Sequence, residues 1–535
     1  MNKLTASEFY KMLTYAAACL EEQAEKVNTL NVFPVPDGDT GSNMSMTLAG
    51  VRNISADKLG TLASCAQSAA DNMLRSARGN SGVILSVFFK GLAKGLEGKT
   101  SADCVRIARA MTNATEAAYG AVMNPTEGTI LTVMRGASEA LVGAYPDSVE
   151  ELLEIATSAA QTALDHTPDQ LPLLKEAGVV DAGGCGFMII LNAFLACVKG
   201  EAADFKVPEP ATAIKMNAAA ECDSEIVFPY CTECIIEKDA GSKKGSDLRN
   251  LAVNIGDSVV FVEDDEIIKI HVHTGDPGAI LTQAVKHGAL ISVKIENMRK
   301  QHTELSGEFS KVELADGVGF VAVASGDGIS DIFKDLGVDV VVSGGQTMNP
   351  STDDLLDAIK ATSKKNVFIL PNNSNIVLTA GTAASLAKEI GIEAAVIPSK
   401  TIPQGITAMF SYDESSSFED NKELMNDSLS TVRSASVTHA VRDAVIDGLD
   451  IKEGQFIGLV EGKVRYTADT LYDCVDKLAE GLEGKSCITA YCGDEMDDKG
   501  VGEIERELEM LFGDNTDVTV IRGGQPVYTL ILSAE

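Results

Sequence analysis

The sequence NVFPVPDGDTGSNM, residues 31–44, places two aspartates one glycine apart and follows them with Thr, Gly, Ser and Asn. Pro, Gly, Asp and Asn are typical of surface turns, so a plain turn is one interpretation. The other is a site where Asp37 and Asp39 hold Mg²⁺ and the metal holds a phosphate group, because Mg²⁺ usually completes its shell with substrate phosphates. Other segments of the sequence are needed to decide between a surface turn and a metal–phosphate site.

Three further segments of the first 200 residues begin helical patterns with Gly, Ser, Thr or Asn. They are RGNSGVILSVFF, EGTILTVMRG and DAGGCGFMIIL, at residues 78–89, 127–136 and 181–191. A helix N-terminus presents unpaired N–H groups and the positive end of its dipole, so it attracts anions, and glycine lets a ligand approach the backbone. One such start is ordinary capping. Four in one helical region favour helix ends that converge on a polyphosphate.

Two other segments approach the P-loop pattern without matching it. AKGLEGKT (residues 93–100) and AEGLEGKS (residues 479–486) have Ala where the first Gly belongs. Both follow helical patterns, whereas a P-loop leads from a strand into a helix. We interpret both as the C-terminal ends of helices.

The chain of 535 residues is long enough for several domains, and its 45% hydrophobic content excludes general disorder. Residues 1–200 carry apolar residues at helical spacing and predict an all-helical domain. A linker is expected at 201–225, and β-rich runs in 226–302 predict a small α+β domain. After a second polar link, 303–318, strands alternate with helices in 319–535, which is typical of an α/β domain.

The charge balance restricts the partners. With 44 basic and 78 acidic residues, a net charge of −34, the chain is a poor candidate for binding nucleic acid or an anionic membrane surface. The N-terminus reads as an amphipathic helix and not a signal peptide. The most apolar run, residues 186–198, is shorter than the about 20 residues that span a bilayer. Eleven cysteines without a secretory signal are typical of reduced thiols. We expect a cytoplasmic protein with no transmembrane segment.

The central region holds a second chemical signal. Two of the six histidines, His271 and His273, form HVH, and positions i and i+2 of a strand lie on one face. The segment YCTEC supplies Cys231 and Cys234, and thiolate with imidazole suits Zn²⁺. A surface histidine pair and small core cysteines are the alternative interpretation.

Four motifs carry a family resemblance: PVPDGDTGSNM, ARGNSGVILS, PTEGTILTV and VVDAGGCGF. They resemble the nucleotide-binding (DhaL or DAK2) domain of dihydroxyacetone kinases. Over its whole length, the chain is similar to the ATP-binding subunits of bacterial fatty acid kinases. The resemblance implies an eight-helix barrel with ATP at its rim and Mg²⁺ on Asp37 and Asp39. It implies that the nucleotide is surrounded by Thr40, Ser42, Asn43, Gly79, Asn80, Ser81, Gly82, Thr129, Asp181 and Gly183.

The resemblance also has a departure. Dihydroxyacetone kinases use a third aspartate shortly before the pair, and here Asn31 is the nearest polar candidate for that metal ligand, with altered spacing. Arg78 is the nearest basic candidate for a phosphate group.

In the central domain the resemblance implies a zinc ion held by Cys231, His271 and His273, with both histidines as candidate catalytic residues. Relatives more often carry a bulky apolar residue at the position of Cys234, so Glu233, water or substrate are the other candidates for a fourth ligand. The C-terminal region would dock a DegV-like fatty-acid-binding partner, and the chain would form a homodimer. Polar loops follow strands there at residues 343–351, 370–376 and 522–528, where either a binding face or plain turns are expected.

The expected function is an ATP- and Mg²⁺-dependent kinase that phosphorylates the carboxylate of a fatty acid held by the partner, giving acyl phosphate for phospholipid synthesis. A carboxylate is already a nucleophile and needs no general base, which fits the absence of histidine from the first 165 residues. A kinase of a small hydroxylated metabolite, as in dihydroxyacetone kinase, and a regulator that binds nucleotide without turnover are the alternatives.

Overall fold

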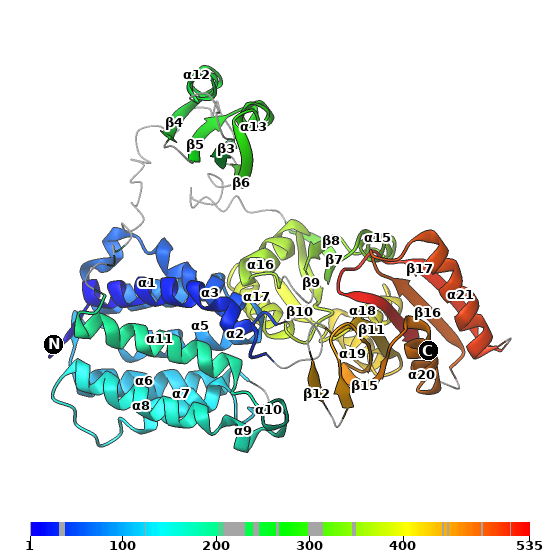
Figure 1. Ribbon diagram of the computed structural model, residues 1–535, viewed down its shortest axis with the longest axis horizontal. Coiled ribbons are helices and arrows are strands. Elements are labelled where there is room, and N and C mark those ends of the chain that lie inside the picture. The colour runs from blue at the N-terminus through cyan, green and yellow to red at the C-terminus, as the bar shows by residue number, and fades with distance from the viewer. Residues whose placement is uncertain are drawn as a thin grey trace. The chain divides into compact units, whose positions relative to one another are not determined.

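The structure is a computed structural model. It describes residues 2–31, 38–122, 125–202, 205, 207, 230–238, 245–263, 267–297, 314–344, 349–440, 443–446, 449–482, 485–513 and 515–535. The chain divides into two compact units. One combines Met1–Ala213 with Leu314–Glu535, and the other is Ile214–Glu313 (Figure 1).

The N-terminal part of the first unit is a bundle of helices (Figure 1). Side chains of Thr5, Thr61, Asp103 and Ser148 cap four of them, and Thr, Asp and Ser are residue types that favour this position. Leu13, Leu85 and Phe187 are among the side chains at the centre of its apolar core. The longer helices are α1 (Ala6–Glu22), α3 (Thr40–Ala49), α4 (Leu62–Arg75), α5 (Gly79–Gly95), α6 (Cys104–Gly120), α7 (Ile130–Glu139), α8 (Val149–Asp165) and α11 (Ala182–Lys199).

Shorter elements complete this part of the chain. They are β1 (Leu4–Thr5), α2 (Ala24–Asn28), the 3₁₀ turns Gly50–Asn53 and Ala56–Gly60, β2 (Ser101–Ala102), α9 (Thr167–Gln170) and α10 (Pro172–Ala177). Strands β1 and β2 pair with each other.

Helix α11 contains the most apolar run of the chain. By length and composition alone it could cross a membrane, but 61% of its apolar window is buried inside the protein. It packs against α1, α7 and α8. Residues 186–198 therefore belong to a helix that is mostly buried in the bundle.

Both near-P-loop segments lie at helix ends, as expected. Helix α5 ends at Gly95, and Gly98 follows with a φ of 70°. Helix α20 (Leu471–Glu480) ends directly before Gly481. Neither segment leads from a strand into a helix.

The second unit is a small α+β fold. Its antiparallel sheet has the order β4-β5-β3-β6, and α12 and α13 cover one face. Cys234, Ile236 and Ile270 are buried between the sheet and these helices. The elements are β3 (Tyr230–Lys238), α12 (Ser246–Ile255), β4 (Gly256–Glu263), β5 (Ile267–Thr274), α13 (Pro277–Ala284) and β6 (Gly288–Asn297).

The α/β region, residues 314–535, begins with a parallel sheet of order β10-β9-β7-β8. Its apolar core includes Phe320, Phe333 and Phe368, and helices pack on both faces. The elements are β7 (Ala315–Ala324), α15 (Asp327–Asp335), β8 (Val340–Ser343), α16 (Thr352–Ala361), β9 (Lys364–Leu370), α17 (Val377–Glu389), β10 (Glu393–Val396), α18 (Ile402–Phe410) and α19 (Phe418–Ser428).

A second sheet follows with the order β15-β14-β11-β18-β16-β17. Strands β16 and β17 are parallel and joined through α21, as the βαβ rhythm predicts, but the other pairs are antiparallel. The elements are β11 (Arg433–His439), the hairpin β12 (Ala444–Ile446) and β13 (Leu449–Ile451), β14 (Phe456–Val460), β15 (Lys463–Ala468), α20, β16 (Cys487–Cys492), α21 (Asp498–Phe512), β17 (Asp517–Arg522) and β18 (Tyr528–Ala534).

The multi-domain organisation is confirmed: a helical N-terminal region and C-terminal α/β sheets. The closed eight-helix barrel and the boundaries at 200, 226, 302 and 319 stay predictions.

Candidate functional site

The starts of the four glycine-rich helices lie next to one another. Close approaches join them in pairs: a Cβ added at Gly79 of α5 would lie 2.6 Å from Asn43 Nδ2 of α3. One added at Gly186 of α11 would lie 2.7 Å from Met44 Sδ of α3, and one at Gly183 would lie 3.1 Å from Ile130 Cβ of α7. The predicted convergence of helix ends is therefore present in the fold.

Packing accounts for several of these glycines. A Cβ at Gly41 would lie 2.0 Å from Ala24 O, and one at Gly82 would lie 2.3 Å from Thr47 Oγ1. One at Gly184 would lie 2.7 Å from Val133 Cγ2. Real Cβ atoms do not approach other atoms so closely, so these positions need glycine for helix contact even before any ligand is considered.

The helix starts differ in how their N–H groups are satisfied. Asn28 Oδ1 accepts from Gly41 N at 2.8 Å and from Ser42 N at 3.1 Å, so a residue of α2 caps α3. The Asp181 carboxylate accepts from Gly184 N at 2.7 Å and so caps α11. Burial raises the pKa of Asp181 to about 6, while the backbone N–H groups of Gly184 and Ile130 lower it.

Helix α5 starts differently. Its N-cap residue is Arg78, whose guanidinium has only donors and gives the helix no side-chain cap. Gly79 follows with a φ of 56°, a conformation that favours glycine. A helix N-terminus with an arginine beside it is suited to an anion. Of the four starts, α5 is the best candidate for binding phosphate.

Asp39 lies beside this start. It is 8% exposed and forms no ion pair among the described residues. Burial raises its pKa to about 6, while hydrogen bonds from the side chains of Asn43 and Asn349 lower it. A buried carboxylate without a cation is unfavourable, and a bound metal ion would relieve that cost. The oxygen ligand and its surroundings therefore fit Mg²⁺.

Asn31 lies next to this carboxylate's helix, with its Nδ2 3.3 Å from Thr40 Oγ1. Ser42 Oγ accepts from Asn28 Nδ2 at 3.0 Å. The hydroxyl groups of Thr40 and Ser42 therefore lie against the side chains of Asn31 and Asn28. Asp37 lies outside the described residues.

Residues of the α/β region reach the same place. The side-chain amide of Asn349, which is 2% exposed, donates to Asp39 Oδ2. Arg78 Nη1 donates to Asn349 O at 2.7 Å, and Arg78 Nη2 lies 3.4 Å from Asp354 Oδ2. The predicted metal ligand and the predicted phosphate ligand are thus both engaged by one segment, residues 349–354.

Two further hydrogen bonds join the helical region to the segment at residues 349–354 and to the loop at residues 370–376. Thr352 N donates to Ala77 O at 3.1 Å, and Asn80 Nδ2 donates to Asn375 Oδ1 at 3.3 Å. Asn349 and Asn375 belong to the polar loops at 343–351 and 370–376, for which the sequence left a binding face or plain turns open. Nothing local in the sequence indicated that these loops contact the helical region.

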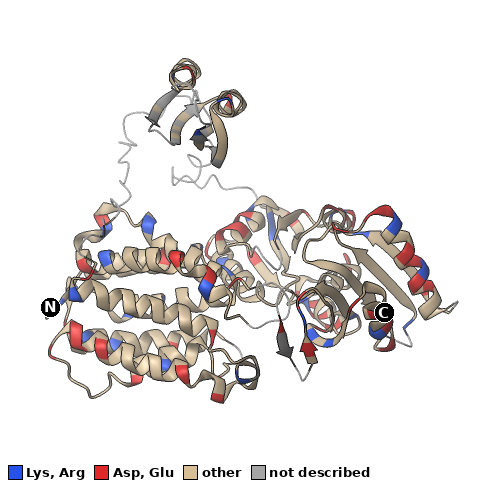
Figure 2. Cartoon of the chain, viewed as in Figure 1, with Lys and Arg blue, Asp and Glu red and all other residues tan. Residues whose placement is uncertain are grey.

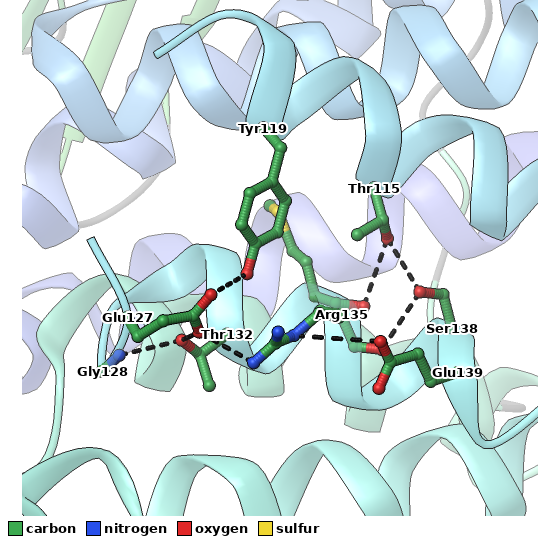
Figure 3. Close-up of polar contacts among 9 residues, drawn as sticks. Thr115, Tyr119, Glu127, Gly128, Thr132, Arg135, Ser138 and Glu139 are labelled. Atoms are coloured by element: carbon green, nitrogen blue, oxygen red, sulfur yellow. Dashed lines mark hydrogen bonds and ion pairs between the residues drawn. The ribbon is translucent and has the colours of Figure 1, made fainter. Parts of the chain in front are cut away.

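The loop before α7 is held by its own network (Figure 3). Tyr119 Oη donates to Glu127 Oε1 at 3.1 Å, and Arg135 Nη2 donates to Glu127 Oε2 at 2.8 Å. Thr132 Oγ1 also donates to Glu127 Oε2, at 2.6 Å, and accepts from Gly128 N. The guanidinium of Arg135 is therefore taken by a carboxylate, while the nearby Thr129 starts the helix without capping it.

The predicted zinc residues lie on neighbouring strands. The register pairs Cys231 with His273 and Glu233 with His271, and these positions share one face of the sheet. Cys234 is excluded from that group because it packs in the core on the opposite face, where it is 1% exposed. Among the side chains that the structure describes, no group of three metal-binding residues occurs, and those of Cys231, His271 and His273 lie outside them.

Three family models match the chain. Residues 34–196 match the DAK2 domain, residues 227–305 match the middle domain of the FakA-like fatty acid kinase proteins, and residues 319–535 match their C-terminal domain.

Full-length relatives also match. An uncharacterized protein of Staphylococcus epidermidis is 38% identical over 563 residues, and protein YloV of Bacillus subtilis is 37% identical over 557 residues. Each match covers 100% of both chains.

Among solved structures, the chain is similar to a DegV family protein of Corynebacterium glutamicum, with 13% identity and a TM-score of 0.32. It is also similar to a DegV family protein of Thermus thermophilus, described by its fatty acid binding, with 17% identity and a TM-score of 0.29. These matches cover 41% of this chain and 97% and 99% of the solved ones. Together with 38% identity to a relative over its full length, the three domain matches show that the chain belongs to the FakA-like family of fatty acid kinase proteins, whose members contain a DAK2 domain.

Proposed function

We propose that this chain is the kinase component that transfers the γ-phosphoryl group of ATP to the carboxylate of a fatty acid. The fatty acid would be held by a separate DegV-like protein, and the acyl phosphate would feed phospholipid synthesis. The observation that carries the proposal is that four helix starts lie next to one another and that one of them directly follows Asp39, a buried carboxylate with no ion pair among the described residues.

The residues have distinct roles in this proposal. Asp39, with Asp37, binds Mg²⁺, which neutralises charge on the transferred group. Arg78 and the N-terminus of α5, including Asn80, Ser81 and Gly82, bind the phosphates. Thr40, Ser42, Asn43, Thr129, Asp181 and Gly183 surround the nucleotide. Asn31 is a candidate third ligand, and its contact with Thr40, the residue after Asp39, supports testing it.

The reaction needs positioning more than acid–base chemistry. A carboxylate oxygen of the fatty acid attacks the γ-phosphorus, the bond from that phosphorus to the β–γ bridging oxygen breaks, and ADP leaves with the electron pair. No proton is removed from the nucleophile. Catalysis therefore depends on alignment of acceptor and donor and on donors fixed around the phosphates.

Three further parts of the proposal concern regions away from this site. Cys231, His271 and His273 bind Zn²⁺ on one face of the central sheet, and their register supports it. The α/β region docks the partner protein. The chain acts as a cytoplasmic homodimer.

Acyl-phosphate trapping tests the proposal. The full chain is mixed with Mg·ATP, a fatty acid and a DegV-like partner, and the mixture is quenched with hydroxylamine. Hydroxamate is expected only with all components, and it should be lost in Asp37→Asn and Asp39→Asn. Circular dichroism must show that both variants are folded, since an unfolded variant would argue against a purely metal-binding role.

The alternatives give different results in the same assay. A kinase of a small hydroxylated metabolite would consume ATP without the lipid-loaded partner. A nucleotide-binding regulator would bind Mg·ATP and form no hydroxamate with any partner.

A further inference from the structure

A cavity of about 420 Å³ lies within the α/β region. Ser325, Gly344 and Pro371 line one side, and each directly follows a strand of the parallel sheet, β7, β8 or β9. Leu459 of β14 and Ile531 of β18 line the other side, so the cavity lies between the two sheets. Its volume is within the roughly 300–1,000 Å³ of small-molecule sites.

The position of the cavity in the topology is informative. In the sheet order β10-β9-β7-β8, β7 and β9 are the two central strands. The connection after β7 leads outward to β8 at one edge, and the connection after β9 leads outward to β10 at the other edge. The carboxyl ends of β7 and β9 therefore form a crevice where open α/β sheets bind ligands. Asn372 fixes this crevice: its Nδ2 donates to Val323 O at 2.9 Å, and its Oδ1 accepts from Ser399 Oγ at 2.7 Å.

The cavity wall includes a strained turn. Val527 has a φ of 71°, and Tyr528 N donates to Pro526 O at 2.8 Å across it. A β-branched residue with positive φ is a genuine outlier, and a tight turn of this kind is rare. Thr438 Oγ1 holds the turn by donating to Val527 O at 2.7 Å. Both flanking residues, Pro526 and Tyr528, line the cavity. Strain maintained in this way concentrates at functional sites.

Three residues of the cavity lining also have positive φ values, with ordinary causes. Asn372, with a φ of 55°, is of a residue type that often adopts this conformation. Glu461 and Gly462 have φ values of 51° and 71° and form the two-residue turn between β14 and β15. Both residues of such a hairpin turn commonly have positive φ. The strain at Val527 has no such explanation.

The lining side chains suit one class of ligand. Ile376, Ile402, Leu459 and Ile531 provide an apolar wall. Lys400 and Lys463, both exposed, line the same cavity and form no ion pair among the described residues. Glu461, an acidic residue of the lining, accepts from Ser434 N at 2.6 Å through its Oε1.

Lys400 and Lys463 are positively charged residues in a chain that is acidic as a whole. Its net charge is −34, and acidic residues follow one another along helices such as α21 (Figure 2). Two lysines at one apolar cavity therefore favour a ligand of negative charge.

We propose that this cavity binds an amphipathic anion, a molecule with an apolar body and one carboxylate or phosphate head group. The apolar body lies against the isoleucines and Leu459, and the head group lies at Lys400 and Lys463. The cavity shares no lining residue with the proposed phosphoryl-transfer site, and the proposal does not depend on that function, although the loop at residues 370–376 lines the cavity and also contacts α5 through Asn375.

Calorimetric titration of the full chain tests the proposal with three probes of equal chain length. Decanoate and decyl phosphate carry the two head groups, and decanol carries neither. At least one anion is expected to bind, with decanol at least about tenfold weaker, a difference of about one charged contact. The anion that binds more tightly identifies the head group.

Variants place the ligand in the cavity. Lys400→Ala with Lys463→Ala should weaken binding of the anion about five- to tenfold and reduce its salt dependence. Lys365→Ala, an exposed lysine away from the cavity, should bind like the parent chain. Leu459→Ala should weaken decanoate and decanol together, and circular dichroism must show each variant folded. No binding of either anion, equal binding of decanol, or an unaffected double variant would overturn the proposal.

Discussion

Asn349 donates a hydrogen bond from its side-chain amide to the carboxylate of Asp39, across 310 positions of sequence. Its backbone oxygen accepts from Arg78 at the same time. The amide presents a donor where a metal ion would bind Asp39, and the carbonyl presents an acceptor where a phosphate would bind Arg78. In the proposed function, the segment at residues 349–354 therefore competes with Mg·nucleotide for two side chains.

The first prediction follows from this competition. Asn349→Ala should raise the affinity for Mg·ADP about three- to tenfold, because a hydrogen bond to a charged group contributes about 1.5–3 kcal/mol and part of it is regained on nucleotide binding. Calorimetric titration of the full chain measures the affinity. Asp353→Asn is the matched control, since it weakens the 3.7 Å ion pair with Arg75 in the same segment and touches neither Asp39 nor Arg78. Weaker binding by Asn349→Ala would mean that the amide assists the nucleotide.

The second prediction concerns the start of α5. Gly79→Ala should lower the free energy of unfolding by about 1–2 kcal/mol, since φ is 56° there, and it should also displace Asn43 and weaken Mg·ADP binding. Gly98→Ala has the same backbone strain, with a φ of 70°, but its Cβ would meet nothing within 4 Å. Thermal unfolding should shift for both variants and nucleotide affinity only for Gly79→Ala. Equal Mg·ADP affinities of the Gly79→Ala and Gly98→Ala variants would show that Gly79 does not contribute to the nucleotide site.

The third prediction is a pH dependence. Burial raises the pKa of Asp181 from 3.8 to about 6, so between these values the folded chain keeps a proton that the unfolded chain has released. The free energy of unfolding that this group contributes therefore falls as pH rises through that window. Relative to Asp181→Asn, the parent chain should lose up to about 3 kcal/mol between pH 4 and 7.

Thermal unfolding followed by far-UV circular dichroism at several pH values checks this difference. As pH rises, the unfolding midpoint of Asp181→Asn should increase relative to that of the parent chain. Parallel midpoints at every pH would show that the carboxyl keeps an ordinary pKa in the folded chain.

The fourth prediction separates two cysteines. Cys231→Ala should lose most of the zinc that purifies with the chain, because Cys231 shares a face of the sheet with His271 and His273. Cys234→Ala should keep the zinc and lose about 1 kcal/mol of stability, because its side chain is in the core. Elemental analysis of both variants measures the metal. Loss of zinc from both would contradict the register argument.

Much of the helical region was predictable because its signals are local. Caps such as Thr5 and Ser148, the ends of α5 and α20, and the four glycine-rich starts all depend on residues within one or two turns of each other. The exclusion of Cys234 was also within reach. Cys231 and Cys234 are three positions apart, and an odd separation puts two residues of one strand on opposite faces.

The second sheet shows a feature that local sequence patterns could not predict, the direction of its strands. The β16–α21–β17 unit follows the predicted rhythm, but β18 returns antiparallel between β16 and β11. Strand direction is decided by pairing partners far away in the sequence, and alternating apolar residues look the same in either direction.

The sequence by itself determined the helical and α/β regions, the aspartate and glycine motifs and the family, because these depend on local pattern and residue type. Tertiary structure alone decided that Asn28 caps α3, that Gly183 of α11 lies against Ile130 of α7, and that Asn349 lies on Asp39. It also formed the cavity between the two sheets of the α/β region. Each of these features joins segments that are distant in the chain, and such contacts exist only once the whole core has packed.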